Sequence, residues 1–349
     1  MRRFDYSSSP NGLLDDQILS LIASIYEHKG RQDLYIQAKA DSLEALCTIA
    51  KIQSTESSNS IEGIRTDASR LKALITSSVS PRDRDEQEIA GYRDVLSLIH
   101  ESYDAIPVSP SVILQLHKMM YRYSGYSYGG HWKDTDNVIA EIDANGHAHT
   151  RFTPLPAIST PRAVQQLCAA YNEAITNHSV DPLVLMSMFV FDFVSIHPFN
   201  DGNGRMSRLL TLLLLYKSGF IVGKYISLEQ VIERSKETYY EALQLSSSGW
   251  LSGTNDYKPF VSYMLGCIRL AYTLFEERVE GIVTPTESKS HRIERAIKRS
   301  PAPISKQEIL SLCPDISEIT VKRTLSSLLQ SGKIEKLGSG RSTTYRWLG

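Results

Sequence analysis

The sequence predicts a mostly α-helical protein, in which a helical bundle carries one small β-hairpin and a smaller domain follows at the C-terminus. Apolar residues recur at helical spacing in several segments, for example residues 13–28 and 84–102. At three places a serine, threonine or aspartate directly precedes a proline, a pair typical of helix starts. The stretch 129–156 instead combines glycine, β-branched residues and polar turns, which favours a hairpin.

The N-terminal hundred residues are predicted to form three helices. We expect the first over Leu13–His28, ending at Gly30, a residue suited to a left-handed cap. The second covers about Leu34–Ile52 and the third Arg84–Ser102. A polar stretch with the sequence QSTESSNSIEGI, at Gln53–Ile64, separates the last two.

The middle of the chain is predicted to form the bundle itself. Three of its helices begin at Ser109-Pro110, Thr160-Pro161 and Asp181-Pro182. Between the first two, the segments VIAEI, DANG and HAHTRF predict two strands and their turn. A fourth helix runs from about Arg205 to Lys217 and ends at Gly219, and helical patterns resume at Tyr239 and Pro259. Residues 281–288 have the composition of a linker.

Composition limits the class of protein. A chain of 349 residues with 42% hydrophobic and 22% charged residues has an ordinary globular balance and suits two or three domains. We find no apolar run long enough to span a membrane and no secretory signal pattern at the N-terminus. The scattered cysteines contain no CxxC pair, so we expect neither disulfides nor zinc, and we predict a cytoplasmic protein. These cysteines are Cys47, Cys168, Cys267 and Cys313.

Charge is distributed unevenly along the chain. The net charge is −1, but residues 289–349 contain twelve Lys or Arg against five Asp or Glu, so the rest of the chain sums to −8. Three short helical segments and two strands are predicted in this basic region, an order that resembles a winged helix. In DNA-binding winged helices the third helix enters the major groove, where it would present Lys322 and Arg323, while Arg341 would lie on the wing. Nucleic-acid binding, protein contact and a purely architectural role all stay open for this domain.

The segment HPFNDGNGRMSR, residues 197–208, carries the strongest chemical signal. Gly202, Asn203 and Gly204 can turn successive N–H groups into one concavity, and this turn opens a helix whose N-terminus favours anions. Arg205 and Arg208 can bind outer phosphates through planar guanidinium groups. Each feature alone has an ordinary structural explanation, as a turn or a salt bridge. Their combination within twelve residues favours a polyphosphate site.

Two further residues of this segment complete a reactive site. Asp201 offers the hard oxygen that Mg²⁺ prefers beside phosphates. His197 is the nearby group that can accept a proton near neutral pH.

The segment resembles the signature of the Fic-domain family, HxFx(D/E)GNGRxxR. All fixed positions are filled, by His197, Phe199, Asp201, Gly202, Asn203, Gly204, Arg205 and Arg208. The resemblance implies a catalytic domain at residues 106–283, with an N-terminal helical region at 1–105 and the winged-helix-like domain at 289–349. Most members of the family transfer AMP from ATP to Ser, Thr or Tyr hydroxyls of proteins.

The resemblance also implies roles for single residues. His197 would take the proton from the attacking hydroxyl, and Phe199 would anchor the loop. Asp201 would hold Mg²⁺ against the α and β phosphates. Backbone N–H groups from Gly202 to Gly204 would stabilise the transferred group. Arg205 and Arg208 would bind the remaining phosphates.

The hairpin resembles the family's flap, which aligns the target by strand addition, with its working edge near Thr150–Pro154. His147 and His149 on this hairpin invite interpretation as metal ligands. They lack a third ligand at suitable spacing, which favours an ordinary hairpin surface. Tyr239 matches a position that contacts the nucleotide base in relatives, while burial in the core is an equal alternative.

A second segment, SNSIEG, resembles the family's inhibitory motif (S/T)xxxE(G/N). It comprises Ser58, Glu62 and Gly63 at the fixed positions. The resemblance implies that Glu62 pairs with Arg208 where the γ-phosphate would sit, so that ATP binds in an unproductive pose. An ordinary capped turn is the alternative interpretation. In some inhibited relatives the same glutamate serves removal of AMP, and the sequence leaves that reverse reaction open.

The predicted function is therefore an autoinhibited protein adenylyltransferase that uses ATP and Mg²⁺ to modify a target protein and itself. The alternative is a nucleotide-responsive transcription regulator that acts through residues 289–349. Relatives that transfer UMP, phosphocholine or phosphate usually carry altered motifs, and the sequence shows no GxxxxGK(S/T), HRD or DFG pattern of common kinases. Family members often form homodimers, but neither the oligomeric state nor the target is readable from the sequence.

Overall fold

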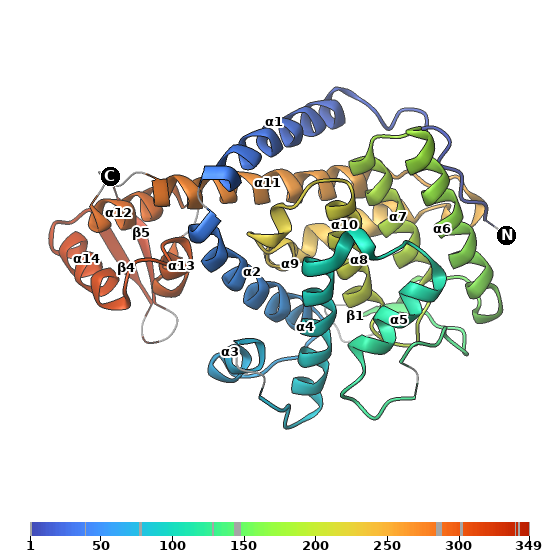
Figure 1. The fold of residues 1–349 in the computed structure, drawn as a ribbon, viewed down its shortest axis with the longest axis horizontal. Helices are drawn as coiled ribbons and strands as arrows, with labels where there is room; N and C mark the ends of the chain where they lie inside the picture. Colours follow the sequence, from blue (N-terminus) through green and yellow to red (C-terminus); the bar gives the residue numbers. More distant parts are fainter. Residues whose placement is uncertain are drawn as a thin grey trace. The chain divides into compact units, whose positions relative to one another are not determined.

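The computed structural model describes residues 2–38, 40–76, 79–127, 129–142, 148–283, 288–300, 303–338, 340 and 343–348. As predicted, the described chain is mostly helical (Figure 1). Contacts between Cα atoms divide it into two compact units. One comprises Met1–Arg31 and Ala50–Tyr272, and the other comprises Gln32–Ile49 and Thr273–Gly349. The N-terminal region and the central bundle therefore share most of one unit, and the three functional domains inferred from the sequence stay a prediction.

The N-terminal helices differ from the prediction in their ends. Helix α1 spans Asp16–Ala38 and continues through Gly30, so the predicted cap at that glycine is wrong. Helix α2 spans Ala40–Ile61, which makes most of the polar stretch helical. The short helix α3 (Ala68–Thr76) was not predicted, while α4 (Arg84–Ser102) has the expected bounds.

The central bundle follows the predicted order, with one further helix at Leu228–Arg234 and with helix at residues 281–283, where a linker was predicted. Its helices are α5 (Pro110–Met120), α6 (Thr160–Asn177), α7 (Pro182–Ile196), α8 (Asn203–Lys217), α9 (Leu228–Arg234), α10 (Lys236–Ser247) and α11 (Lys258–Val283). Short 3₁₀ turns lie at Tyr103–Ala105, Ala157–Ser159, Val222–Lys224 and Trp250–Ser252. Helix α7 is almost entirely buried and packs against α6 and α8, and α8 also packs against α4. The two buried helices therefore hold the turn between them, residues 197–202, against the centre of the unit.

Two of the three predicted helix starts are confirmed in detail. Ser109 Oγ accepts a hydrogen bond from Val112 N–H at 3.3 Å, and Asp181 Oδ1 accepts one from Leu183 N–H at 2.9 Å. Helix α6 begins one residue earlier than predicted, because Ser159 occupies the capping position and Thr160 is already helical.

The hairpin consists of β1 (Ile139–Ile142) and β2 (Ala148–Phe152), which pair antiparallel with an irregularity between Ile139 and Ala140. The turn at residues 143–147, including His147, lies outside the described residues. His149 lies in β2 opposite Glu141. Strand β2 packs near α10, and the Phe152 ring lies 5.9 Å from Trp250, so the hairpin is attached to the bundle at its second strand.

The second unit contains the predicted three helices and hairpin. They are α12 (Lys289–Arg299), α13 (Lys306–Leu312), α14 (Glu318–Gln330), β4 (Ile334–Leu337) and β5 (Thr344–Trp347). An additional short strand, β3 (Ile304–Ser305), was not predicted and pairs with β5, giving the sheet order β3-β5-β4. The core of these elements is aliphatic and includes Ile293, Ile309, Val321 and Leu325. Arg341 lies outside the described residues.

The N-terminal segment closes over a buried carboxylate of α7. Asp192 is fully buried, and Arg2 pairs with it at 3.3 Å. Tyr6, Trp250 and Tyr257 each donate a hydrogen bond to the same carboxylate, at 2.5, 2.6 and 2.7 Å. A buried charge is tolerated only when paired and hydrogen-bonded, so this cluster fixes the start of the chain to the helix that leads into residue 197.

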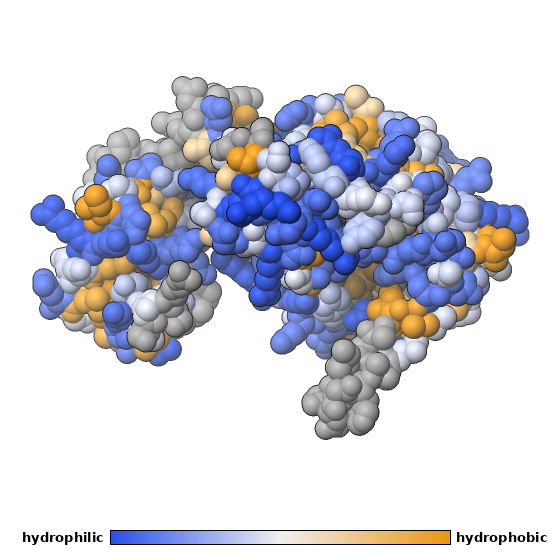
Figure 2. Space-filling view, turned by 90° about the horizontal axis from the view of Figure 1, so that it is seen from below, coloured by the Kyte–Doolittle hydropathy of each residue, from blue (hydrophilic) through white to orange (hydrophobic). Residues whose placement is uncertain are grey.

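Within the described chain, no helix is both long and apolar enough to cross a bilayer. On the face shown in Figure 2, hydrophobic residues form separate groups among hydrophilic ones.

Candidate active site

His197 ends helix α7 in a left-handed backbone conformation, with φ of 52°. Its N–H still makes a helical hydrogen bond, to Phe193 O at 3.1 Å, while its left-handed backbone ends the helix. The ring atom Nδ1 lies 3.4 Å from Val194 O. Because a carbonyl oxygen can only accept, this contact favours a proton on Nδ1 and leaves Nε2 with a free lone pair.

The imidazole of His197 is held in its neutral form. Burial, and to a smaller extent the nearby Lys133 ammonium, lowers the pKa of His197 to about 4, while Val194 O, Glu62 and Asp201 act in the opposite direction. A histidine with this pKa is an unprotonated base throughout the physiological range.

The loop after His197 is tied to itself by Asn203. The Asn203 amide accepts from Phe199 N–H at 2.9 Å and donates to Phe199 O at 2.8 Å. Phe199 is buried, and its ring stacks on His117 at 3.7 Å with an interplanar angle of 1°. Gly130 N–H donates to Nδ1 of His117, which therefore donates from Nε2 to Asp201 O, both at 3.0 Å. The turn is thus supported at two of its backbone carbonyls.

Helix α8 begins directly after this loop, with Gly202 at its capping position. The first N–H groups of a helix have no acceptor inside it, and the helix dipole makes this end attractive to anions. An anion is already present there, because Glu62 Oε1 lies 2.2 Å from the position that a Cβ of residue 204 would occupy. Only glycine at position 204 leaves room for a carboxylate this close.

Arg208 receives the same carboxylate. Its Nη2 donates to Glu62 Oε1 at 2.7 Å and to Ser58 O at 2.9 Å, while Nε donates to Ser58 Oγ at 2.8 Å. The Arg208 side chain is 3% exposed and that of Glu62 is 33% exposed. The structure therefore brings Arg208 together with Ser58 and Glu62, which precede it by 150 and 146 residues in the sequence.

The end of helix α2 explains why a glycine follows Glu62. Ile64 N–H donates to Asn59 O and Gly63 N–H donates to Ser60 O, both at 3.0 Å, which is the bonding of a Schellman motif. This motif needs a left-handed residue after the cap, and Gly63 has φ of +82°. Lys236 Nζ also donates to Ile61 O at 2.9 Å. The helix end is thereby fixed with Glu62 directed at Arg208.

Asp201 is the acidic residue of the loop, and its side chain is 47% exposed. Its Oδ1 accepts from Gly202 N–H at 2.7 Å and its Oδ2 accepts from Tyr121 OH at 2.9 Å. Each oxygen keeps a further lone pair, which fits a Mg²⁺ ion that takes one protein carboxylate and otherwise phosphate oxygens and water. Among the described residues there is no cluster of three or more potential metal ligands, so such an ion would depend on the substrate phosphates.

Arg205 has different partners from those predicted. Its guanidinium is 1% exposed and pairs with Glu88 at 2.7 Å. Its Nη2 also donates to Tyr121 OH at 2.7 Å and lies 3.8 Å from Asp201. In this arrangement it supports Asp201 through the tyrosine, and direct contact with a phosphate stays a prediction.

Tyr239 is buried among aromatic rings, which agrees with the core interpretation. Tyr240, Tyr263 and Phe260 lie within 5.4, 5.7 and 6.2 Å of its ring. Burial raises the pKa of Tyr239 to about 12. The half-buried Tyr240 next to it stacks with the Arg151 guanidinium of the hairpin at 5.1 Å. A base contact by Tyr239 stays a prediction.

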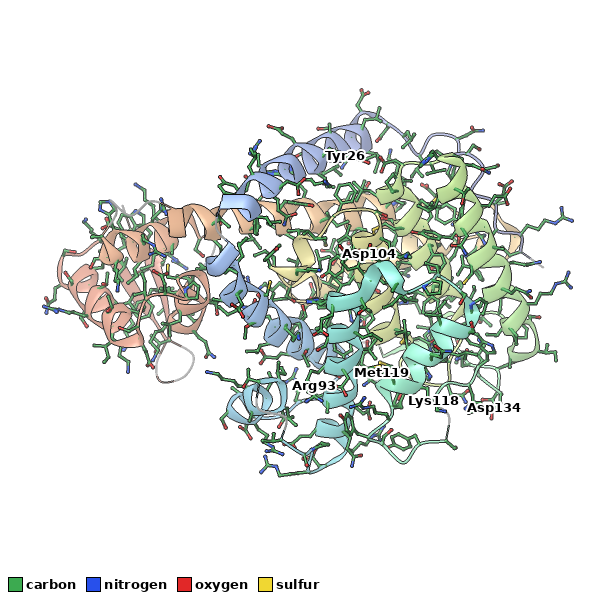
Figure 3. The ribbon with its side chains drawn as sticks, viewed as in Figure 1. Tyr26, Arg93, Asp104, Lys118, Met119 and Asp134 are labelled. Carbon is green, nitrogen blue, oxygen red and sulfur yellow. The ribbon has the colours of Figure 1, made fainter. Side chains whose placement is uncertain are left out.

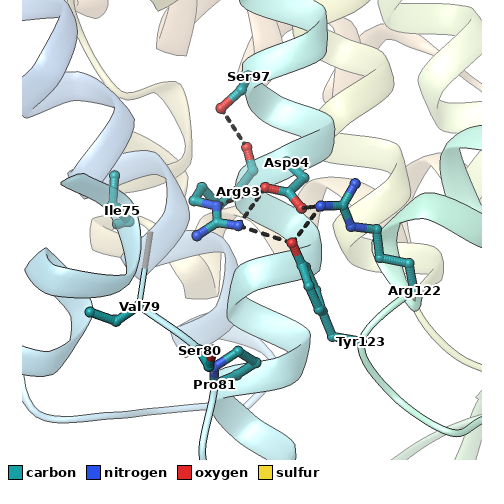
Figure 4. Close-up of a pocket in the computed structure, with 9 residues that line it drawn as sticks. All are labelled: Ile75, Val79, Ser80, Pro81, Arg93, Asp94, Ser97, Arg122 and Tyr123. Atoms are coloured by element: carbon teal, nitrogen blue, oxygen red, sulfur yellow. Dashed lines mark hydrogen bonds and ion pairs between the residues drawn. The ribbon is translucent and has the colours of Figure 1, made fainter. Parts of the chain in front are cut away.

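A separate pocket of about 480 Å³ lies between α3, α4 and residues 122–123 (Figure 4). Asp94 in this pocket bridges Arg93 and Arg122, at 2.6 and 2.8 Å. None of the lining residues belongs to the segment 197–208, so this pocket is distinct from the candidate site.

On the predicted nucleic-acid face of the second unit, two lysines share one carboxylate. Lys322 is paired with Glu318 at 3.0 Å, and Lys306 contacts the same carboxylate at 2.8 Å. Arg323 is exposed. These pairings reduce the positive charge that α14 would offer to phosphates.

Several residues of the site were not predicted from the sequence. Tyr92 is hydrogen-bonded to Ser58 and donates to Glu229 at 3.0 Å, which extends the Arg208 network into α9. Lys133, His117, Tyr121 and Glu88 likewise support the loop from distant segments. These supporting residues belong to no local sequence pattern. His117 and Lys133 precede the segment 197–208 within the same bundle.

Comparison with known proteins agrees with this geometry. Residues 107–215 match the Fic/DOC family. The chain is 24% identical over 254 residues to protein adenylyltransferase fic-1 of Caenorhabditis elegans, covering 67% of this chain and 45% of that protein. It is 33% identical over 97 residues to protein adenylyltransferase Fic of Aedes aegypti, covering 27% of this chain and 16% of that protein. The chain spans less than half the length of these curated relatives.

Solved structures show the same fold. A Fic family protein from Desulfovibrio desulfuricans superposes with a TM-score of 0.62 at 23% identity, covering 98% of both chains. A Fic domain containing signaling protein from Bacteroides thetaiotaomicron gives a TM-score of 0.59 at 20% identity, covering 76% of this chain and 98% of that one. The fold is therefore that of Fic proteins, with the helical bundle and hairpin expected from the sequence.

Proposed function

We propose that this chain is an autoinhibited protein adenylyltransferase, which moves AMP from ATP to a hydroxyl of a target protein and of itself. The observation that carries the proposal is the carboxylate of Glu62, which is bound to Arg208 and lies against residue 204 at the N-terminus of α8. A site that holds one anion in this way offers the charge and the donors that a polyphosphate needs. The names of the relatives support the choice of AMP as the transferred group.

In the proposed reaction the target hydroxyl attacks the α-phosphorus of ATP. Nε2 of His197 accepts the hydroxyl proton as the new O–P bond forms, because Nδ1 is engaged with Val194 O. The bond between the α-phosphorus and its bridging oxygen breaks, and pyrophosphate leaves with the electron pair. The N–H groups at the start of α8 would stabilise the charge that develops on the transferred group. A Mg²⁺ ion at Asp201 would neutralise part of the phosphate charge.

Inhibition follows from competition for one guanidinium group. Arg208 cannot bind Glu62 and an outer phosphate in the same position, so ATP must bind elsewhere or displace the carboxylate. A ligand bound outside the productive geometry loses the advantage of correct alignment with the nucleophile. We therefore propose that transfer requires release of the α2 end from Arg208.

Intact-mass measurement of the Glu62→Gly protein after incubation with ATP and Mg²⁺ tests this proposal. We expect addition of one or more adenylates, and none when His197→Ala is combined with it. Absence of any adenylate on the protein or on added protein substrates, while ATP binds, would contradict the proposal.

The hairpin is proposed to align the target segment along the edge of β2, at Thr150–Pro154. Backbone pairing is supported by the antiparallel hairpin and its attachment near Trp250. Removal of AMP through Glu62, homodimer formation and nucleic-acid binding by residues 289–349 have no specific support in the described contacts.

A further inference from the structure

Residues 133–137, which we call the clamp segment, bind the backbone around His197. Lys133 N–H donates to Pro198 O at 2.8 Å, and Lys133 Nζ donates to Ile196 O at 3.2 Å. Asn137 Nδ2 donates to Phe199 O at 3.3 Å. The clamp segment therefore binds the carbonyl oxygen of Ile196, which precedes His197, and those of Pro198 and Phe199, which follow it.

Further contacts make the clamp segment rigid. The Asn137 side chain accepts from Lys133 Nζ at 2.9 Å, so the two clamping side chains hold each other. Asp134, labelled in Figure 3, accepts from Asn200 Nδ2 at 3.0 Å. These contacts offset the cost of a left-handed backbone at a residue other than glycine, which is about 1–2 kcal/mol.

The charge of Lys133 is also placed to act on the imidazole. Lys133 is 3% exposed, so water screens its ammonium poorly. The charged groups with the largest effect on the His197 imidazole are Lys133 from the clamp segment, Glu62 from α2 and Asp201 from the loop. The two carboxylates favour an imidazolium, and Lys133 is the cation of this set that opposes them.

We propose that Lys133 is a positioning residue for the transfer reaction: it fixes the turn that carries His197, and its positive charge adds to burial in disfavouring the protonated imidazole. This inference rests on the proposed function, since a neutral imidazole is needed by a general base. The direction agrees with the pKa of His197, which burial and then Lys133 lower to about 4. The ammonium also favours return of the captured proton to water, which resets the base for another cycle.

Burial lowers the pKa of Lys133 itself to about 8, and Asp136 opposes that shift. Lys133 is therefore still charged where His197 titrates, so the two groups interact throughout the acid range.

Titration of His197 by NMR, with ¹³C-labelled histidine in the full-length Glu62→Gly protein, tests this proposal without requiring turnover. The signal is assigned by its loss in His197→Ala. In Lys133→Met we expect the midpoint to rise by about one pH unit, and in Lys133→Arg to stay near the parent. Lys217→Met is the matched control, because Lys217 also donates to main-chain carbonyls, those of Tyr103 and Asp104, and should leave the midpoint unchanged.

Lys133→Gln serves if Lys133→Met does not fold, since it keeps a donor while losing the charge. An unchanged His197 midpoint in whichever charge-free variant folds would overturn the proposal. The pH profile of adenylate transfer supplies the second readout, and its acid limb should move upward in parallel with the midpoint. If the midpoint moves but no variant transfers adenylate, the proposed function fails while the charge effect of Lys133 stands.

Discussion

Glu62 Oε1 lies 2.7 Å from Arg208 Nη2, and the same oxygen lies against the backbone of residue 204 at the start of α8. One carboxylate thus occupies both anion-binding features of the site. The pair is only partly exposed, so each partner depends on the other more than partners in a surface salt bridge do.

Substitutions of Glu62 should separate the effect of its charge on inhibition from the effect of its shape. Glu62→Gln keeps an oxygen that can accept from Arg208 but loses the charge, so we expect self-modification between the parent and Glu62→Gly. Since the amide keeps a bond from the guanidinium but loses the Coulomb attraction of the carboxylate, the Gln protein should lie several-fold above the parent. Initial rates of adenylate incorporation provide the measurement. Equal rates in all three proteins would show that Glu62 does not inhibit.

Gly63 offers a test that leaves both ionic groups in place. A Cβ at this position meets no atom within 4 Å, so we expect Gly63→Val to act through the cost of the left-handed backbone. That cost is about 1–2 kcal/mol, which should loosen the α2 end and raise transfer about five- to thirtyfold. Gly63→Asn is the matched control, because asparagine tolerates this conformation. If the valine and asparagine proteins transfer equally, the Schellman motif does not aim Glu62.

The buried pair of Arg2 and Asp192 predicts that the stability of the fold depends on the contact between the N-terminal segment and α7. Arg2→Met leaves a buried carboxylate without its cation and should lower the free energy of unfolding by about 3–5 kcal/mol. Adding Asp192→Asn removes the charge but keeps a polar partner for Tyr6 and Trp250, so it should recover part of the loss. Chemical denaturation of the two variants measures both effects. A double variant less stable than Arg2→Met would argue against an electrostatic cause.

Glu86 predicts how stability responds to acid. Hydrogen bonds from Arg70 lower the pKa of Glu86 to about 2, with further help from Arg82. Because the folded pKa lies below the unfolded one, the stabilisation is present above pH 4.5 and is lost as the pH falls toward 2. Glu86→Gln should cost roughly 2 kcal/mol at neutral pH, allowing for the exposed Arg82, and should flatten the acid loss. An equal acid slope in parent and variant would contradict the assignment.

The sequence predicted the elements whose signals are local. The caps at Ser109 and Asp181, the hairpin and the continuous apolar run of α7 all depend on neighbouring residues, and all are found. The errors lie where tertiary contacts dominate. The polar stretch that begins at residue 53 separates two helices in the prediction, yet residues 53–61 continue the first of them as α2, with Ser54, Ser58 and Asn59 buried.

The candidate site was predictable from the sequence where its residues are contiguous. Residues 197–208 are contiguous, so their pattern revealed the loop and the helix start. The partners of Arg205 could not be foreseen, because Glu88 and Tyr121 come from α4 and the end of α5. Lys133 was missed for a related reason, since its significance lies in the carbonyls it reaches across the fold.

The most direct test of the account uses ATP labelled at either the α or the γ phosphate, supplied with Mg²⁺ to the Glu62→Gly protein. We predict that the protein retains label from the α position, that it retains none from the γ position, and that His197→Ala abolishes the retention. Retention of γ label, or of α label at an undiminished level in the His197→Ala protein, would contradict transfer of AMP by this base.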